Sequence, residues 1–233
     1  MEIIFELSRI LFITGTDTGV GKTLLTAALL FHLRRKKIRA LAMKPFCSGS
    51  RDDVDFLQSL QPGELSDELM NPFFFSAPLA PMVAARMVKR KIRVSDARRA
   101  IAAVKKHCDF LLVEGAGGLL SPCGENFSLL NLIEKMGGEV VIAGWNRLGT
   151  INHTMLNVRA LEEAGIEAIK IVMMRPKNCD KSSQTNVAVL RELLRGVEVF
   201  EWPFLGGRAS SGTGLRREYK KIKKVLARLV GDH

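Results

Sequence analysis

The stretch Gly15-Thr16-Asp17-Thr18-Gly19-Val20-Gly21-Lys22-Thr23 decides the fold of this chain. Residues 10–13 before it are apolar and rich in isoleucine, as in a short buried parallel strand, and residues 24–30 after it carry alanine and leucine at helical spacing. A glycine-rich loop between a strand and a helix binds phosphate well, because its glycines let backbone N–H groups close around the phosphate oxygens. The sequence therefore predicts a nucleotide site here.

Two side chains of this loop have chemical roles. Lys22 supplies a positive charge, and the hydroxyl of Thr23 can ligate Mg²⁺. The spacing departs slightly from G-x-x-x-x-G-K-[ST], because Thr16 stands where the first glycine is expected and Gly15 is one residue earlier. The alternative is a tight turn with an incidental Gly-Lys-Thr, which the flanking strand and helix patterns disfavour. The residues expected to bind the nucleotide in this loop are Gly19, Val20, Gly21, Lys22, Thr23 and Leu24.

Length and composition indicate one α/β domain spanning residues 1–233. Hydrophobic residues make up 47% of the chain, enough for a full core, yet no apolar run is long enough to predict a membrane span. Residues 1–6 lack the basic region and cleavage site of a signal peptide and are interpreted as a short leader or an extra strand. The four cysteines lie far apart with no C-x-x-C pair, so we expect neither a zinc site nor disulfides, and a reduced cytoplasm.

The formal net charge of +11 raises the question of an anionic partner. Residues 215–233 carry seven Lys or Arg against two acidic residues, while their apolar residues recur at three- and four-residue steps. This pattern predicts an amphipathic helix with a solvated basic face. A nucleic-acid surface is the alternative, which the lack of aromatic residues between the charges disfavours. We therefore expect no nucleic-acid partner.

Strands and helices are predicted to alternate along the chain, with no internal repeat and no domain boundary. The expected strands are 10–13, 38–44, 110–114, 139–144, 168–174 and 197–201. The expected helices are 21–35, a short one opening at the acidic cluster Asp52, Asp53 and Asp55, and 82–88, 95–107, 127–136, 150–164, 182–195 and 215–233. Residues 46–50 are expected to form a loop, and the proline- and phenylalanine-rich residues 61–81 irregular structure packed on the body. Such alternation implies right-handed crossovers and a doubly wound, mostly parallel sheet with helices on both faces, of the P-loop NTPase type.

Charged residues collect where the predicted strands end. Lys44 ends the second strand, Asp52 and Asp53 lie just beyond it, and Glu114 ends the third. Ligands of an open parallel sheet bind at this edge, so we expect these side chains to face the phosphate loop. Thr23 with two carboxylates suits Mg²⁺, and Lys44 would be a second cation near the γ-phosphate. Each residue alone could be an ordinary surface charge, but their joint placement favours a site.

With these residues in view, the chain resembles the dethiobiotin synthetase family, the ATP-dependent ligases of biotin biosynthesis. The matching motifs are the phosphate loop, Lys-Pro-Phe-Cys-Ser-Gly (44–49), Val-Glu-Gly-Ala-Gly-Gly (113–118) and Leu-Gly-Thr-Ile-Asn-His (148–153). They occur in the family's order over residues 10–160, and residues 71–85 match its substrate segment more weakly.

The resemblance implies a reaction of small molecules: 7,8-diaminononanoate, CO₂ and a nucleoside triphosphate. One amine forms a carbamate with CO₂, ATP phosphorylates the carbamate, and the neighbouring amine closes the ring with release of phosphate. The resemblance also implies Mg²⁺ and a homodimer, in which the helix start at residue 150 binds the substrate carboxylate of the other subunit. An ordinary capped helix is the alternative for that segment.

Residue roles follow from the same resemblance. The catalytic residues implied are Lys44 and Lys22, and the metal ligands are Thr23, Asp53 and Glu114, with Asp52 as competitor for Asp53. The substrate-binding residues implied are Thr18, Ser48, Thr150 and Asn152. Beyond the phosphate loop, the nucleotide-binding residues implied are Glu114, Gly115, Ala116, Gly117, Met174, Arg175 and Pro203.

Three departures from the family pattern concern base and substrate recognition. Met174 stands where the family has an asparagine that reads adenine, Met82 stands where it often has a histidine, and residues 201–215 match only loosely. Two other classes share the loop: amide ligases of corrin precursors, which are usually longer, and partition- or septum-type switch ATPases. The latter carry an extra lysine early in the loop, where this chain has Thr16-Asp17-Thr18.

Overall fold

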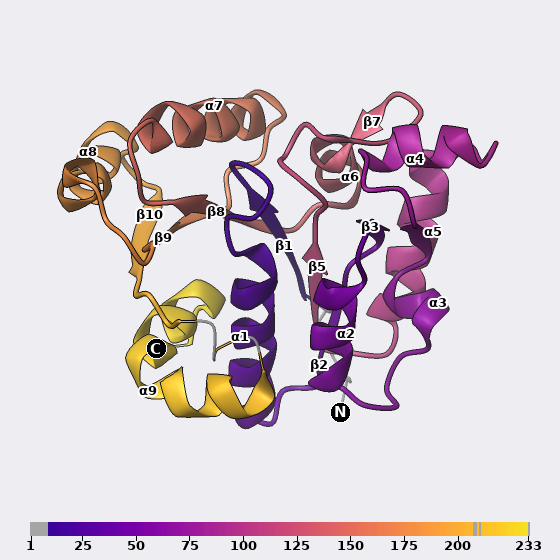
Figure 1. The fold of residues 1–233 in the computed structure, drawn as a ribbon, viewed down its shortest axis with the longest axis horizontal. Coiled ribbons are helices and arrows are strands. Elements are labelled where there is room, and N and C mark those ends of the chain that lie inside the picture. The colour runs from indigo at the N-terminus through magenta and orange to yellow at the C-terminus, as the bar shows by residue number, and fades with distance from the viewer. Residues whose placement is uncertain (1–8, 207–208, 210, 233) are drawn as a thin grey trace, which may run out of the picture.

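The computed structural model describes residues 9–206, 209 and 211–232. Six strands of this part of the chain form one parallel sheet in the order β10-β9-β8-β1-β5-β2 (Figure 1). Their bounds are β1 Arg9–Gly15, β2 Ala40–Met43, β5 Phe110–Glu114, β8 Glu139–Trp145, β9 Ile169–Met174 and β10 Glu198–Trp202. The predicted doubly wound α/β fold is therefore confirmed.

Strand β1 is central because it pairs with β5 on one side and with β8 on the other. Residues 10–15 are buried, as the apolar run predicts for a strand covered on both faces. The chain then winds outward in both directions, through β5 to β2 and through β8 and β9 to β10. The loop after β1 therefore lies at the point where the strand order reverses, which is where open parallel sheets bind their ligands.

Helices pack on both faces of the sheet. In Figure 1, α7 lies above the strands β8 and β9 and α9 lies below them, and α1 packs against α9. The helix bounds are α1 Lys22–Arg35, α2 Asp52–Ser59, α3 Asp67–Met70, α4 Pro81–Met87, α5 Val94–Lys105, α6 Leu129–Met136, α7 Thr150–Glu163, α8 Asn186–Leu193 and α9 Gly212–Val230.

Two predictions for the segment after β2 are wrong. Residues 46–50 contain a short strand, β3 (Phe46–Ser48), and the supposedly irregular residues 61–81 contain α3 and a second strand, β4 (Phe73–Phe75). The two strands pair in parallel, and the rings of Phe46 and Phe73 stack with centroids 5.0 Å apart. Three-residue strands have no readable period, and their pairing depends on residues far apart in the chain.

Smaller differences lie elsewhere. A two-stranded antiparallel sheet of β6 (Pro122–Gly124) and β7 (Phe127–Ser128) precedes α6, and a 3-10 helix (Lys181–Gln184) replaces the first turn of the helix predicted at 182–195. The leader or extra strand predicted at residues 1–6 lies outside the described residues. Within the described ranges, no helix has both the length and the apolar character needed to cross a membrane.

The C-terminal helix α9 has the amphipathic character that the sequence predicts. Leu215, Ile222, Leu226 and Leu229 are buried, while the seven basic residues of the helix are exposed. On its inner face Tyr219 hydrogen-bonds with Nδ1 of His32 of α1 at 2.8 Å. His32 is buried, and its Nε2 lies 3.5 Å from the carboxylate of Asp232 just beyond α9.

This contact should make folding sensitive to acid. Burial lowers the pKa of His32, although Asp232 partly opposes the effect. An imidazole whose pKa is lowered in the folded state favours folding above its unfolded pKa, and this contribution is lost as the pH falls from the unfolded pKa through the folded pKa. We expect the free energy of unfolding to fall from pH 7.5 to pH 5.5 more steeply in the wild type than in His32→Asn.

The slopes of the free energy of unfolding against pH for the wild type and His32→Asn cannot differ by more than about 1.4 kcal/mol per pH unit, the limit for one proton. Urea unfolding at several pH values measures it, and His107→Asn, which changes an exposed histidine, is the matched control. Parallel pH profiles for the wild type and His32→Asn would show that His32 does not couple α9 to protonation.

Candidate functional site

The phosphate loop closes tightly on itself between β1 and α1. Gly21 caps α1 with a φ of 95°, a conformation that side chains rarely adopt. A Cβ at Gly15 would lie 2.6 Å from Cγ2 of Val20, so the loop has no room for a side chain at its start either. The shifted first glycine of the motif thus serves the close packing of the loop.

Lys22 lies inside the loop rather than in solvent. Its Nζ donates to the carbonyl oxygen of Asp17 at 2.9 Å, and the residue is only 6% exposed. Burial lowers the pKa of Lys22 to about 8, although the nearby Glu114 carboxylate opposes the shift. The carboxylates near Lys22 in the described chain do not outweigh its burial, and a bound phosphate would add the negative charge that favours the ammonium.

Lys44 directly follows β2 and is held by both its backbone and its side chain. Its N–H donates to the carbonyl of Met70 and its own carbonyl accepts from Nδ2 of Asn71 at 2.6 Å. Its Nζ donates to Glu114 Oε1 at 2.9 Å and pairs with Asp53. Burial by itself would lower the pKa of Lys44, but these two carboxylates outweigh it and raise the pKa.

Glu114 is the most deeply buried acid of the site. It is 0% exposed, and its Oε1 accepts from Thr23 Oγ1 at 2.7 Å as well as from Lys44. Its Oε2 is buried with no hydrogen-bond partner among the described residues. A buried carboxylate oxygen without a donor costs free energy, so this atom is suited to a ligand that the chain itself does not provide.

Thr23, Asp53 and Glu114 therefore converge as the metal prediction requires. No group of three or more His, Cys, Asp and Glu side chains suited to a metal occurs in the described chain. Two carboxylates and one hydroxyl still fit Mg²⁺, which keeps several waters and takes phosphate oxygens alongside a few protein ligands. Asp53 rather than Asp52 contacts the cluster, because only its carboxylate pairs with Lys44.

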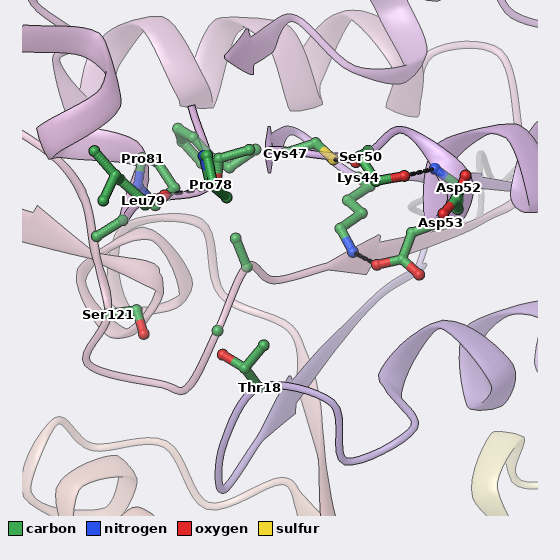
Figure 2. Close-up of a pocket in the computed structure, with 15 residues that line it drawn as sticks. Thr18, Lys44, Cys47, Ser50, Asp52, Asp53, Pro78, Leu79, Pro81 and Ser121 are labelled. Atoms are coloured by element: carbon green, nitrogen blue, oxygen red, sulfur yellow. Dashed lines mark hydrogen bonds and ion pairs between the residues drawn. The ribbon is translucent and has the colours of Figure 1, made fainter. Parts of the chain in front are cut away.

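Two adjoining cavities meet at Lys44. The first has a volume of about 420 Å³ and follows the phosphate loop. Its lining comprises Thr18, Gly19, Gly21, Lys22, Thr23, Leu24, Lys44, Asp52, Asp53, Phe56, Glu114 and Gly117. The second has a volume of about 510 Å³ and is shown in Figure 2. Its lining comprises Thr18, Lys44, Phe46, Cys47, Ser48, Ser50, Asp52, Asp53, Pro78, Leu79, Ala80, Pro81, Ala116, Gly117 and Ser121.

The second cavity depends on the strand pair that the sequence did not predict. Pairing of β3 with β4 brings the loop 76–80 beside Ser48, whose Oγ donates to the carbonyl of Leu79 at 2.6 Å. Figure 2 shows Pro78, Leu79 and Pro81 at the end opposite Asp52 and Asp53. The cavity therefore has an apolar end and a charged end. The sequence signals for this wall were the proline-rich composition of residues 72–81 and the weak match of residues 71–85 to the family's substrate segment.

Some residues that were predicted to bind the nucleotide line neither of these two cavities. Val20 and Gly115 are buried, and a Cβ at Gly115 would lie 2.4 Å from Cδ2 of Leu129. These two residues shape the loops, while their neighbours Gly117 and Ala116 line the cavities.

Thr150 and Asn152 at the start of α7 also lie outside both cavities. Thr150 is 3% exposed and its N–H donates to the carbonyl of Arg147, whereas Asn152 is exposed. The described chain thus does not bring these two predicted substrate residues to Ser48.

Met174 is not among the lining residues of these two cavities either. Its side chain packs against the phosphate loop, with Cε 2.8 Å from the position that a Cβ at Gly21 would take. Arg175 and Pro203 line a separate cavity of about 400 Å³ at the ends of β9 and β10, together with Asn146 and Glu201. Arg175 contacts Sγ of Cys179 through Nε at 3.3 Å.

Comparison with known proteins shows the family of the chain. A family model described as an AAA domain matches residues 9–201. An ATP-dependent dethiobiotin synthetase BioD from Anaeromyxobacter sp. (strain Fw109-5) is 42% identical over 182 residues, which cover 75% of this chain and 80% of that protein. One from Nitrosopumilus maritimus (strain SCM1) is 32% identical over 227 residues, covering 93% and 98%. The chain belongs to the ATP-dependent dethiobiotin synthetase family.

Solved structures of lower similarity show the same fold in other proteins. The MinD cell division protein of Aquifex aeolicus superposes with a TM-score of 0.65 at 16% identity, covering 97% of this chain and 98% of that one. An ATP complex of Cyanothece McdA gives a TM-score of 0.63 at 12% identity, with the same coverage. At these identities the likeness concerns the fold alone. The dethiobiotin synthetase relatives confirm the family resemblance and the ligase class that the four motifs predict.

The pKa values of Lys22 and Lys44 are shifted in opposite directions, and measuring them tests the charge arrangement of the site. We expect Lys22 to titrate near pH 8 in the nucleotide-free protein, and Lys44 to stay protonated beyond the ordinary lysine range. Reductive ¹³C-methylation followed by NMR titration measures both, with Lys22→Arg and Lys44→Arg assigning the signals. Titration of both amines near the ordinary lysine value would contradict the described charge arrangement.

Proposed function

We propose that the protein forms dethiobiotin from 7,8-diaminononanoate, CO₂ and ATP through a phosphorylated carbamate. The observation that carries this proposal is the meeting of the two cavities at Lys44. One cavity follows a phosphate loop, and the other has an apolar end suited to an alkyl chain. Membership of the dethiobiotin synthetase family supports the same substrate and the same reaction.

The reaction builds up negative charge where the two lysines lie. A neutral amine adds to CO₂ and loses a proton, which gives a carbamate anion. A carbamate oxygen then takes the γ-phosphoryl group of ATP, and ADP leaves. The second amine attacks the carbonyl carbon, the C–O bond to phosphate breaks, and a proton leaves the nitrogen. Lys22 and Lys44 neutralise the phosphoryl and carbamate oxygens, since phosphoryl transfer depends on positioning and charge more than on covalent help.

We infer that Thr23, Asp53 and Glu114 hold Mg²⁺ and that Thr18 and Ser48 bind the substrate. The orphan Oε2 of Glu114 and the Thr23–Glu114 hydrogen bond support the metal assignment. Mg²⁺ held by these residues would neutralise part of the charge of the triphosphate. Lys44 pairs with Oε1 of Glu114 and with Asp53, which leaves Oε2 of Glu114 for the metal ion.

We further propose a homodimer, a single domain and a cytoplasmic location without a nucleic-acid partner. The dimer is supported by Thr150 and Asn152, which lie outside both substrate cavities of their own chain. Exposed leucines at residues 120, 148 and 156 around this helix start are suited to burial by another copy. The four cysteines are free, which agrees with a reducing compartment.

The proposed reaction predicts phosphate release that requires both diaminononanoate and bicarbonate. Lys44→Gln should lower the single-turnover rate at least ~100-fold, about 3 kcal/mol, while ATP affinity stays nearly unchanged. Rapid-quench kinetics and ATP calorimetry measure the two effects, and Lys106→Gln, an exposed lysine, is the control. A variant rate within a few-fold of wild type would remove Lys44 from the mechanism, and phosphate release without dethiobiotin would overturn the function.

Base recognition should be relaxed. The thioether of Met174 packs on Gly21 and offers no hydrogen-bond donor, so an asparagine's contact with adenine is lost. The loop contacts to the triphosphate do not depend on the base, and one lost base hydrogen bond is worth ~1–3 kcal/mol. We expect CTP, GTP and UTP to support the reaction within about tenfold of ATP. Values of kcat/KM at saturating diaminononanoate and bicarbonate test this, and a thousandfold preference for ATP would contradict it.

The dimer proposal predicts complementation between two inactive variants. Lys44→Gln damages the site of its own chain, and Asn152→Trp should damage the site of the other chain. A mixed dimer then keeps one intact site, so an equal mixture should recover about a quarter of the wild-type rate after subunit exchange. Mass spectrometry of isotope-labelled mixtures verifies the exchange. Exchange without recovered activity would show that each site is complete within one chain.

A further inference from the structure

The cavity along the phosphate loop is called the phosphate cavity here, and the cavity of Figure 2 is called the substrate cavity. The charged end of the substrate cavity contains one acidic residue, Asp52, to which the proposed function assigns no role. Five residues line both cavities, and the charged ones are Lys44, Asp52 and Asp53. Figure 2 shows Asp52 beside Asp53, at the end of the cavity away from Pro78, Leu79 and Pro81. A group bound at this junction therefore meets both the phosphate cavity and the substrate cavity.

The negative charges at the junction differ in whether they are already paired. Asp53 and Glu114 both form ion pairs with Lys44, which largely neutralises their negative charges. Asp52 uses its backbone N–H to bind Ser50 Oγ at 3.0 Å. Its carboxylate makes no hydrogen bond or ion pair within the described chain.

The nearest basic residue along the chain does not neutralise Asp52. Arg51 turns its guanidinium to Asp67 at 3.0 Å and to Asp55 at 3.7 Å. The carboxylate of Asp52 thus lines both cavities and has no ion-pair partner within the described chain. A cation bound there would gain a charge-assisted hydrogen bond without displacing an internal partner.

The substrate of the proposed function brings such a cation. A vicinal diamine must present one neutral amine for CO₂ uptake, and this amine becomes an anionic carbamate that Lys22 and Lys44 attract. The other amine stays an ammonium until ring closure, and the same two lysines repel it. The ammonium therefore needs an anion of its own within reach of the phosphate cavity.

We propose that Asp52 binds the ammonium group of the diamine and so orients the two nitrogens, one toward the lysines and one toward α2. This inference rests on the proposed function and adds a specificity-determining residue to it. It separates the two neighbouring aspartates by role: Asp53 serves the metal ion and Asp52 serves the substrate.

Steady-state kinetics of Asp52→Asn test the assignment. We expect the KM for diaminononanoate to rise at least about tenfold, because a hydrogen bond to a charged group is lost. The kcat at saturating diamine should stay within about threefold of wild type, and the KM for ATP and the half-saturating Mg²⁺ concentration should stay unchanged. Asp52→Glu, which keeps the charge, should recover most of the diamine affinity.

Two variants of the same helix serve as controls. Asp55→Asn makes the identical chemical change at a residue that lines neither cavity, and it should leave all of these constants unchanged. Asp53→Asn should raise the Mg²⁺ requirement, which shows that the assay detects loss of a metal ligand. Calorimetry with diaminononanoate alone should show weaker binding to Asp52→Asn than to the wild type.

The outcomes separate this inference from the proposed function. Dethiobiotin formation with a diamine KM within twofold of wild type in Asp52→Asn would overturn the assignment of Asp52 alone. A raised Mg²⁺ requirement in Asp52→Asn would also overturn it, because Asp52 would then belong to the metal site. Failure of the wild-type protein to form dethiobiotin would instead overturn the proposed function, and the assignment with it.

Discussion

The ion pair between Lys44 and Glu114 joins the ends of β2 and β5, and both of its side chains are buried from water. Removing one partner of a buried pair leaves an uncompensated charge, so the surrounding backbone must hold both groups in place. Asn71 holds the carbonyl of Lys44, and Thr23 of the phosphate loop holds Glu114. The pair thereby links the substrate segment, the central sheet and the nucleotide loop.

The winding of the sheet gives this pair its position. Because β1 lies between β5 and β8, its loop opens beside Glu114, and the helix that follows presents Thr23 to the same carboxylate. The two cavities then divide the chemistry. Lys22 and Lys44 lie in the cavity along the phosphate loop, and the second cavity has an apolar end formed by Pro78, Leu79 and Pro81. A reaction that joins a phosphorylated carbamate to an amine needs these two environments side by side.

Most helices and the strands of the main sheet were predictable, and the strands of two or three residues were not. All six strands of the main sheet were expected near their observed places, because a buried parallel strand is a continuous apolar run. Strands β3 and β4 were missed, since the stacking of Phe46 on Phe73 stabilises them across a separation that no local pattern reports. The same pairing builds the wall of the substrate cavity, so the cavity itself could not be foreseen.

For the site, the sequence alone determined the phosphate loop and the charged residues at the strand ends, because motif spacing and strand polarity are local properties. It also determined the family, through four motifs in order. Only the tertiary structure separated Asp53 from Asp52, turned the side chain of Met174 onto Gly21, and kept Thr150 away from Ser48. The direction of a side chain depends on which residues, distant in sequence, pack around it, and the local sequence does not contain that information.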